Sequence, residues 1–249
     1  MSGHSKWATI KRKKGKNDAA RGKLFTKLIR EITVAAREGG GDEGSNPRLR
    51  TAVLAAKAEN MPAANIERAI KKGTGELPGE SYESVIYEGY GAGGVAIMIE
   101  ALSDNKNRTV AEMRHLFTKH NGNLGENGSV SWMFSQKGYI AVDRARVSED
   151  DLMLVALDAG AEDITDEEDV WEVTTALQDF DRVKKALDEA GIPYHQAELV
   201  RKPQNMVRVE GKTAGQVLNL LNVLEDHDDT QKVFSNFDID TKELAVLTA

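Results

Sequence analysis

Apolar residues near the start of the chain recur every three or four positions, which is the spacing of amphipathic helices. Residues 22–38 carry one such stripe, and Gly39 to Gly41 follow it as a helix end. Asn46 and Pro47 supply a cap and a first helical residue for a second helix. A third helix is expected from Pro62 to Lys72, ending at Gly73. The pattern therefore predicts a small bundle of three helices.

The period changes after a glycine- and proline-rich stretch, residues 73–81, which is typical of a linker. Alternating residues at 85–88 and 95–102 predict two strands joined by a glycine loop. Residues 108–120 predict a helix, and residues 129–135 predict a third strand that carries Val130, Trp132 and Phe134 on one side. This order is β-β-α-β.

The next segment has a complete pattern of its own, in the order β-α-β-β-α-β of a ferredoxin-like unit. Its strands are expected at 139–142, 161–164, 170–175 and 194–200, and its helices at 148–159 and 180–190. A strand (206–209), a helix (214–224) and a strand (232–239) follow it. These last elements are too few to enclose a core alone, so we expect them to complete the β-β-α-β region.

The predicted fold class is multidomain, α and α+β. A basic N-terminal three-helix domain spans residues 1–76, and an α+β domain spans 77–137 plus 204–249. An acidic, ferredoxin-like α+β domain, residues 138–203, is inserted into the second domain. The ends of inserted domains tend to lie close together, which permits this arrangement.

Composition narrows the class of protein. The 249 residues include no cysteine, which excludes disulfides, thiolate metal sites and cysteine nucleophiles. No apolar run approaches the roughly 20 residues that span a bilayer, and no apolar region follows the basic start as in a secretory signal. We therefore expect a cytoplasmic protein without a membrane partner.

Charge is sorted along the chain. The whole sequence has 33 basic and 40 acidic residues, a net charge of -7, yet residues 1–30 carry +9 and residues 31–249 carry -16. A basic segment of this kind suits a polyanion, because lysine and arginine displace the counterions condensed on nucleic acid. A solvated tail without a partner is the alternative, although Trp7 and Ile10 interrupt the charges and an amphipathic helix follows directly.

The candidate nucleic-acid contacts are the basic residues of this segment and of the second helix, together with one aromatic residue. Trp7 is expected either to stack on a base or to anchor the segment on the bundle. The full set is Lys6, Trp7, Lys11, Arg12, Lys13, Lys14, Lys16, Arg21, Lys23, Lys27, Arg30, Arg48 and Arg50.

Four other stretches could carry chemistry. Gly89–Gly94 matches G-x-G-x-x-G, but a strand follows where a dinucleotide site needs a helix, so a hairpin loop with positive φ angles is expected. The polar residues 102–109 could hold a phosphate, but an ordinary loop capped by Asn107 or Thr109 explains them better. Glu112 and His115 are expected to form a helix-surface pair. The acidic residues 225–229 lack the ligand spacing of a calcium loop, which favours a solvated turn.

No serine-hydrolase elbow, phosphate-binding lysine loop or zinc-protease motif occurs. We therefore predict no enzymatic activity, cofactor, metal or small-molecule substrate. A metal- or nucleotide-dependent enzyme that uses the clefts between domains, with a ligand at 225–229 or 89–94, is a third hypothesis.

Long, specific strings throughout the sequence resemble the YebC family. They are GHSKW (3–7), RGKLFTKLIRE (21–31), NPRLR (46–50), NIERAIKKG (65–73), YEGYG (87–91), SDNKNRT (103–109), FTKH (117–120) and GNLG (122–125). The resemblance implies three domains, a helical one followed by two α+β domains of which one is inserted in the other. It brings no catalytic residues.

The resemblance also implies a regulatory function. Bacterial members of the YebC family are usually named probable transcriptional regulators that bind DNA, while other members activate mitochondrial translation or resemble ribosome-associated factors. We therefore predict a non-enzymatic, DNA-binding transcriptional regulator. The alternative is a ribosome-associated translation factor that binds ribosomal RNA, because no helix-turn-helix recognition helix is visible in the sequence.

Overall fold

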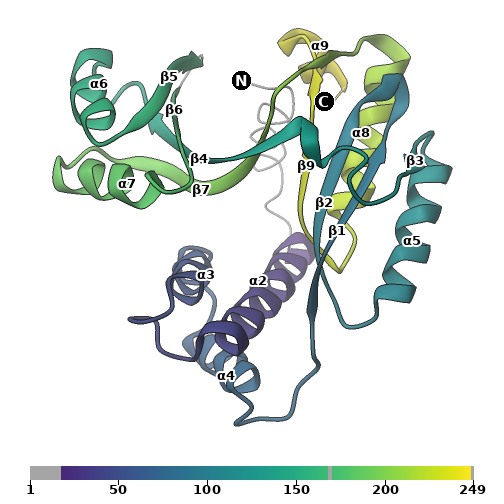
Figure 1. Ribbon diagram of the computed structural model, residues 1–249, viewed down its shortest axis with the longest axis horizontal. Coiled ribbons are helices and arrows are strands. Elements are labelled where there is room, and N and C mark those ends of the chain that lie inside the picture. Colours follow the sequence, from purple (N-terminus) through teal and green to yellow (C-terminus); the bar gives the residue numbers. More distant parts are fainter. Residues whose placement is uncertain (1–17, 168–169, 248–249) are drawn as a thin grey trace.

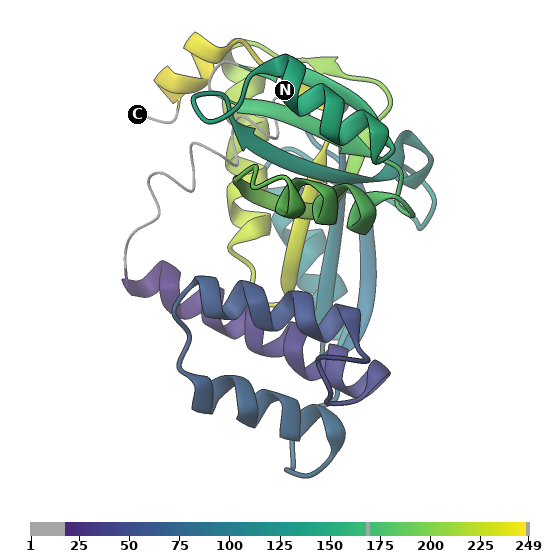
Figure 2. The same ribbon diagram turned by 90° about the vertical axis from the view of Figure 1, so that its left-hand side faces the viewer.

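The computed structural model describes residues 18–167 and 170–247. The first elements form a helical group, which lies below both sheets in the views of Figures 1 and 2. Helix α2 packs against the other two helices, and the buried residues of this group include Ile32, Leu49 and Val53. The three helices are α2 (Asp18–Gly39), α3 (Pro47–Ala58) and α4 (Ala63–Thr74). The predicted three-helix bundle is confirmed.

Asn46 begins α3 as predicted and also closes α2. Its side-chain oxygen accepts a hydrogen bond from the main-chain N–H of Leu49 at 3.0 Å. Its amide donates to the carbonyls of Ala35 and Gly40, both at 2.8 Å. One buried side chain thus satisfies main-chain groups at the end of one helix and the start of the next.

Gly73 does not end the third helix, which continues to Thr74. The left-handed cap is Gly75, with φ of 84°. Gly73 instead lies against α2, where an added Cβ would come within 2.4 Å of the carbonyl oxygen of Thr33 and 2.7 Å of the Cβ of Ala36. Glycine is required here because α4 and α2 approach each other closely. The sequence pattern of a helix end does not indicate this contact.

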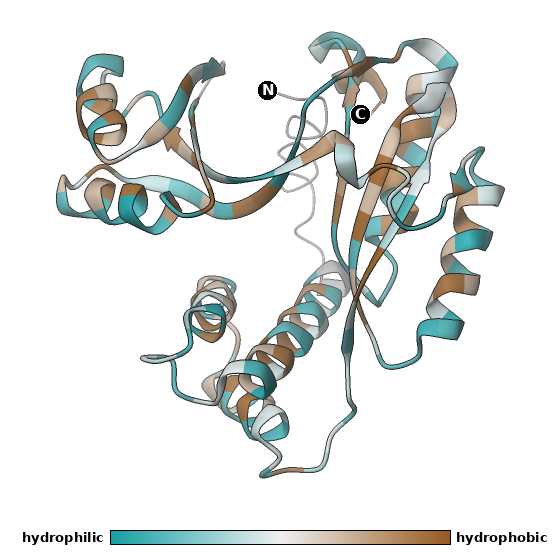
Figure 3. Cartoon of the chain, in the orientation of Figure 1, coloured by the Kyte–Doolittle hydropathy of each residue, from teal (hydrophilic) through white to brown (hydrophobic). Residues whose placement is uncertain are grey.

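The first sheet has the antiparallel order β3-β1-β2-β9. One of its faces carries the main apolar core, which includes Ile97 and Ile99 from the sheet, Phe117 from α5 and Leu221 from α8. Figure 3 shows the apolar residues of the strands and helices in this region. The elements are β1 (Glu83–Tyr90), β2 (Ala96–Ser103), α5 (Lys106–Lys119), β3 (Asn123–Leu124), α8 (Gly211–Glu225) and β9 (Thr230–Ser235).

The glycine loop joins β1 to β2 as a hairpin, as predicted. It contains a short 3-10 turn, η1 (Ala92–Gly94), with positive φ at Gly93 (70°) and Gly94 (76°). The main-chain N–H of Gly91 donates to the carbonyl of Val95 at 2.8 Å and closes the loop. The glycines therefore serve the turn geometry.

The second sheet has the antiparallel order β5-β6-β4-β7, and α6 and α7 pack on its apolar face. This is the ferredoxin-like arrangement predicted from the element order. Ser148 caps α6 as predicted, with its hydroxyl 3.2 Å from the N–H of Asp151. The elements are β4 (Phe134–Asp143), α6 (Glu149–Asp158), β5 (Ala161–Glu167), β6 (Val170–Thr175), α7 (Phe180–Glu189) and β7 (Tyr194–Pro203).

The strand predicted at 129–135 is wrong in its first half. Residues 131–133 form a 3-10 turn, η2 (Ser131–Met133), and β4 then runs without a break through the expected domain boundary. The carboxylate of Glu88, a buried residue, accepts hydrogen bonds from the main-chain N–H groups of Gly128, Val130 and Ser131 at 2.7–2.8 Å. These three bonds bend the chain where a strand would continue.

A long β4–β7 ribbon connects the two sheets. Ion pairs tie β7 to the first sheet: Arg201 Nε lies 3.1 Å from Glu100 Oε1, and Lys232 Nζ lies 2.5 Å from Glu198 Oε2. The first sheet contains β1–β3, which precede the second sheet in the sequence, and β9, which follows it. This is the connectivity that an insertion produces.

The end of the chain also differs from expectation. The strand predicted at 232–239 breaks at Asn236, a buried residue whose side-chain oxygen accepts the N–H of Ala96 at 2.8 Å. Beyond the break, β10 (Phe237–Asp238) pairs in parallel with β8 (Val207–Arg208), and an unpredicted helix, α9 (Thr241–Leu247), follows. Among the helices of the described residues, none combines the length and apolar character that crossing a membrane requires.

Candidate nucleic-acid interface

The predicted contact residues fall into three places. Arg21, Lys23, Lys27 and Arg30 lie on α2, while Arg48 and Arg50 lie exposed on α3. The remaining candidates lie outside the described residues: Lys6, Trp7, Lys11, Arg12, Lys13, Lys14 and Lys16.

Three basic residues of α2 form a basic stripe: Lys23, Lys27 and Arg30. Their spacing of four and then three residues places them on one face of the helix. The stripe meets an acidic turn, Glu225–Asp229, at the end of α8. Lys23 Nζ donates to the carbonyl of Asp226 at 3.2 Å, and Lys27 Nζ donates to that of Glu225 at 2.6 Å. Cations suit this place because the end of a helix presents unpaired carbonyls and a partial negative charge.

Arg30 completes the contact with a charged partner. Its Nη1 donates to the carbonyl of Asp228 at 2.6 Å and to Oδ1 of Asp229 at 2.7 Å. Its guanidinium also lies over the ring of Tyr82, 5.1 Å from the centroid. The helical group is therefore fastened to the first sheet through Arg30.

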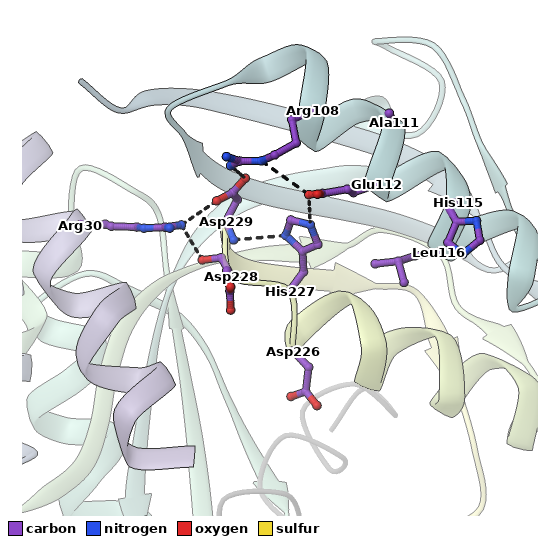
Figure 4. A pocket seen from close by; sticks show the side chains of 10 residues that line it. All are labelled: Arg30, Arg108, Ala111, Glu112, His115, Leu116, Asp226, His227, Asp228 and Asp229. Carbon is purple, nitrogen blue, oxygen red and sulfur yellow. Dashed lines mark hydrogen bonds and ion pairs between the residues drawn. The ribbon is translucent and has the colours of Figure 1, made fainter. Parts of the chain in front are cut away.

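Asp229 is the centre of this contact, with a side chain that is only 2% exposed. Its Oδ2 accepts from Arg108 Nη2 at 2.7 Å and from the hydroxyl of Thr109 at 2.6 Å, so α2 and α5 both hold the same carboxylate (Figure 4). Burial raises the pKa of Asp229, but the hydrogen bonds from Thr109, Arg108 and Arg30 outweigh burial and hold the pKa below its ordinary value.

The start of α5 is organised around Asp229. The cap is Asn105, whose side-chain oxygen accepts the N–H of Arg108 at 3.1 Å, and not Asn107 or Thr109 as predicted. Thr109 is fully buried and serves Asp229 instead. Hydrogen bonds to Asp229 and Asp104 raise the pKa of Arg108, so its charge is fixed. Residues 102–109, which the sequence offers as a possible phosphate site, thus bind the carboxylate of Asp229.

The predicted solvated turn is only partly right: Asp226 and Asp228 are exposed, but Asp229 is buried and His227 is largely enclosed. His227 Nδ1 accepts the main-chain N–H of Asp229 at 3.2 Å, so in a neutral ring Nε2 carries the proton. Nε2 lies 2.9 Å from Glu112 Oε2. Glu112 thus pairs with a histidine of the turn and not with His115.

A hollow of about 780 Å³ lies beside these residues and is lined by Arg30, Arg108, His115 and the acidic turn, among others. Ligand atoms of Glu112, His227 and Asp229 lie within 4.8 Å of one another, as in a metal site. Both oxygens of Asp229 are already bound by arginines, and a cation would have to displace them. The geometry therefore favours an ion-paired joint.

Arg48 forms ion pairs with two carboxylates of α2. Its guanidinium lies 2.7 Å from Glu31 Oε1 and 2.5 Å from Glu38 Oε2, which binds α3 to α2. The hydrogen bond to Glu31 is the main cause that raises the pKa of Arg48. Arg50 is exposed on the same helix.

Asp229, Arg108 and Thr109 lie in stretches that the sequence marks as possible sites, but their contact with one another and with Arg30 is not predicted from it. A signal for two of them was present, since Arg108 and Thr109 belong to the string SDNKNRT that resembles a known family. Asp229 stands among four other acidic or histidine residues, and nothing in the spacing singles it out.

The chain matches two family models. The model described as TACO1/YebC protein N-terminal domain matches residues 5–76, and the model described as TACO1/YebC second and third domain matches residues 82–237. Among solved structures, the crystal structure of a conserved hypothetical protein from Aquifex aeolicus is similar, with a TM-score of 0.81 and 53% identity over 90% of this chain and 92% of that chain.

Several curated relatives bear the name probable transcriptional regulatory protein. The one from Desulfotalea psychrophila is 60% identical over 241 residues, 96% of each chain. The one from Desulfosudis oleivorans is 59% identical over 95% of this chain and 96% of the relative, and the one from Thermotoga maritima is 58% identical over 98% and 96%. The chain belongs to the TACO1/YebC family, and its relatives are named as regulators.

Proposed function

We propose that this protein is a non-enzymatic regulator that binds the phosphate backbone of nucleic acid through its basic N-terminal segment. The observation that carries the proposal is the sorting of charge: residues 1–30 carry +9 and residues 31–249 carry -16. Lysine and arginine gain affinity for a polyanion by releasing its condensed counterions. The acidic remainder limits adhesion elsewhere on the surface.

The name of the relatives points to transcription as the process that is regulated. The target would then be duplex DNA, contacted along its backbone by the basic residues between 6 and 21. Phosphate contacts set position and affinity but carry no sequence information, so recognition of particular promoters would need further contacts to base edges.

Action on RNA in translation is a second candidate, and one observation favours it. The basic face of α2, the helix best placed by its charge to enter a major groove, lies against the acidic turn through Lys23, Lys27 and Arg30. Backbone and shape recognition, which structured RNA offers, needs no helix inserted into a groove.

The test is a pair of matched charge variants. Replacement of Lys11, Arg12, Lys13 and Lys14 by glutamine should weaken binding to duplex DNA or an RNA hairpin, measured by fluorescence anisotropy. The control replaces Lys119, Lys185, Lys212 and Lys242, which are exposed, and changes the net charge equally. Melting temperatures of both should stay near that of the parent; for the control the reason is that exposed charges contribute little to stability.

Equal binding by the two variants would show that total charge and not the basic segment attracts nucleic acid. The parent protein binding neither ligand would refute the proposed function itself.

A further inference from the structure

We propose that the acidic turn, residues 225–229, is an internal competitor for nucleic acid. It occupies the basic stripe of α2. Phosphates reach Lys27 and Arg30, which are partly buried, only when the joint between α2 and the turn opens, and Lys23, at the exposed edge of the joint, is released with them. This inference rests on the proposed function and adds a regulated second contact surface to it.

The contacts on the turn use the same atoms that a phosphate would use. Lys23 Nζ, Lys27 Nζ and Arg30 Nη1 each donate to an oxygen of the turn at 2.6–3.2 Å. A phosphate oxygen would accept from these same donors. The nearby carboxylates of the turn would repel a phosphate, so the two anions exclude each other.

The strength of the hold differs along the stripe. The two lysines donate to neutral carbonyls, and a charged phosphate is the better acceptor for an ammonium group. Arg30 is paired with the carboxylate of Asp229, which is 2% exposed and also held by Arg108 and Thr109. Asp229 therefore supplies the charged contact of the joint that a single substitution can remove.

The joint between α2 and the acidic turn consists of hydrogen bonds and an ion pair, for which another anion can compete. The apolar cluster of the helical group draws its members from residues 25–70, and that of the first sheet from residues 85–244, so the clusters of the described residues share no member. Other contacts near the joint are also polar: Arg37 donates to Ser81 and to the carbonyl of Glu80. Relative motion is expected where domains meet through small polar interfaces.

The experiment uses the full chain and Asp229→Asn, which removes the charge that holds Arg30 and leaves every basic residue in place. Asp228→Asn is the matched control. It makes the same change in charge one residue away, and the Arg30 bond to the Asp228 main-chain carbonyl does not depend on that side chain. Tyr82→Leu is a second variant, which weakens the hold on Arg30 without unpairing a buried charge and so covers a failure of Asp229→Asn to fold.

Binding of a fluorescent duplex and of an RNA hairpin is titrated at several salt concentrations. Asp229→Asn should bind at least about threefold more tightly than Asp228→Asn, with a slope of log affinity against log salt steeper by about 1 to 3 for one to three added phosphate contacts. Tyr82→Leu should shift both quantities in the same direction by less.

Opening is measured directly with two spin labels, because the chain has no cysteine of its own. Thr51→Cys on α3 and Thr118→Cys on α5 are exposed and report the distance across the joint. The distance distribution should broaden when nucleic acid is added to the parent, and should be broad already in Asp229→Asn without it.

Equal affinity and salt slope in Asp229→Asn, Tyr82→Leu and Asp228→Asn, with an unchanged distance distribution, would overturn the inference and leave the proposed function standing. Absence of binding by the parent and by every variant would refute the proposed function and this inference with it.

Discussion

Arg30 and Asp229 stand 199 residues apart in the sequence and meet at 2.7 Å between Nη1 and Oδ1. Arg30 comes from the helical group, and Asp229 lies in the turn between α8 and β9, next to the first sheet. Arg108 binds the other oxygen of the same carboxylate. One buried carboxylate thus neutralises two arginines from separate elements, and its loss would leave both without their shared partner.

Asp229→Asn should lower the free energy of unfolding by about 3 kcal/mol at pH 7, the scale for unpairing a partly buried ion pair. The pKa of Asp229 is held below its ordinary value in the folded protein. A lowered carboxyl pKa contributes stability that is complete above the unfolded pKa and is lost as pH falls through the folded pKa. The difference between parent and variant should therefore stay constant from pH 7 to about 5 and shrink below about 4.

Urea unfolding at a series of pH values measures this difference, and subtraction removes carboxylates common to both proteins, such as Glu88. Asp228→Asn, exposed in the same turn, should change stability by less than about 0.5 kcal/mol. A difference that grows on acidification would mean that the pKa of Asp229 is raised and not lowered.

Gly73→Ala should destabilise the protein even though alanine is favoured over glycine in helices by about 1 kcal/mol. The added Cβ would come within 2.4 Å of the carbonyl oxygen of Thr33, and main chain cannot move aside easily. Gly22→Ala is the control, since it is also helical and has open space around it. Thermal melting should show a loss for Gly73→Ala and no loss for Gly22→Ala.

Most elements of the fold could be predicted because their signals are local. The cap at Asn46, the hairpin of glycines at 89–94 and the ferredoxin-like order of 138–203 each follow from residue type and spacing. The errors at Gly73, at 129–133 and at Asn236 have a common cause. In each place a residue is fixed by a partner distant in sequence: Thr33 for Gly73, Glu88 for the turn and Ala96 for Asn236.

The candidate site was harder to predict than the fold. The basic face of α2 is visible in the sequence as Lys23, Lys27 and Arg30. Its partner is a carboxylate some 200 positions later, and no periodicity connects the two. Burial of Asp229 depends on packing among α2, α5 and β9. The composition of residues 225–229 predicts a solvated turn and does not reveal that one of its acids is buried.

The proposed insertion predicts that the chain can be divided at the β4–β7 ribbon. Lys137 and Val200 are direct partners in it, so residues 138–199 can be replaced by a two-residue Asn-Gly turn that suits a hairpin. The shortened protein should unfold cooperatively in urea, because the Arg201–Glu100 pair and both faces of the first sheet remain.

Removal of residues 134–203 with the same turn is the matched control. It takes away Phe134 and Val200, which pack with Ala96 and Met98 on the second face of the first sheet, and should cost cooperativity. A shortened 138–199 protein that unfolds without a transition would contradict the insertion as an independent unit.

The last prediction separates sequence-specific reading from adhesion to a backbone, and so separates the two candidate functions. If about six basic residues contact duplex DNA, log affinity should fall against log salt with a slope of about -5. A regulator of particular promoters must also prefer its site over random duplex by typically 10³-fold or more. The predicted phosphate contacts are numerous, and three of those on α2 are held by the acidic turn, away from any base edge. We therefore expect a steep salt slope, weak discrimination among duplexes, and tighter binding to structured RNA than to random duplex of equal length. Competition at fixed salt between labelled hairpin RNA, random duplex and promoter fragments measures all three affinities. One DNA fragment preferred a thousandfold over both competitors would contradict this expectation and establish promoter recognition.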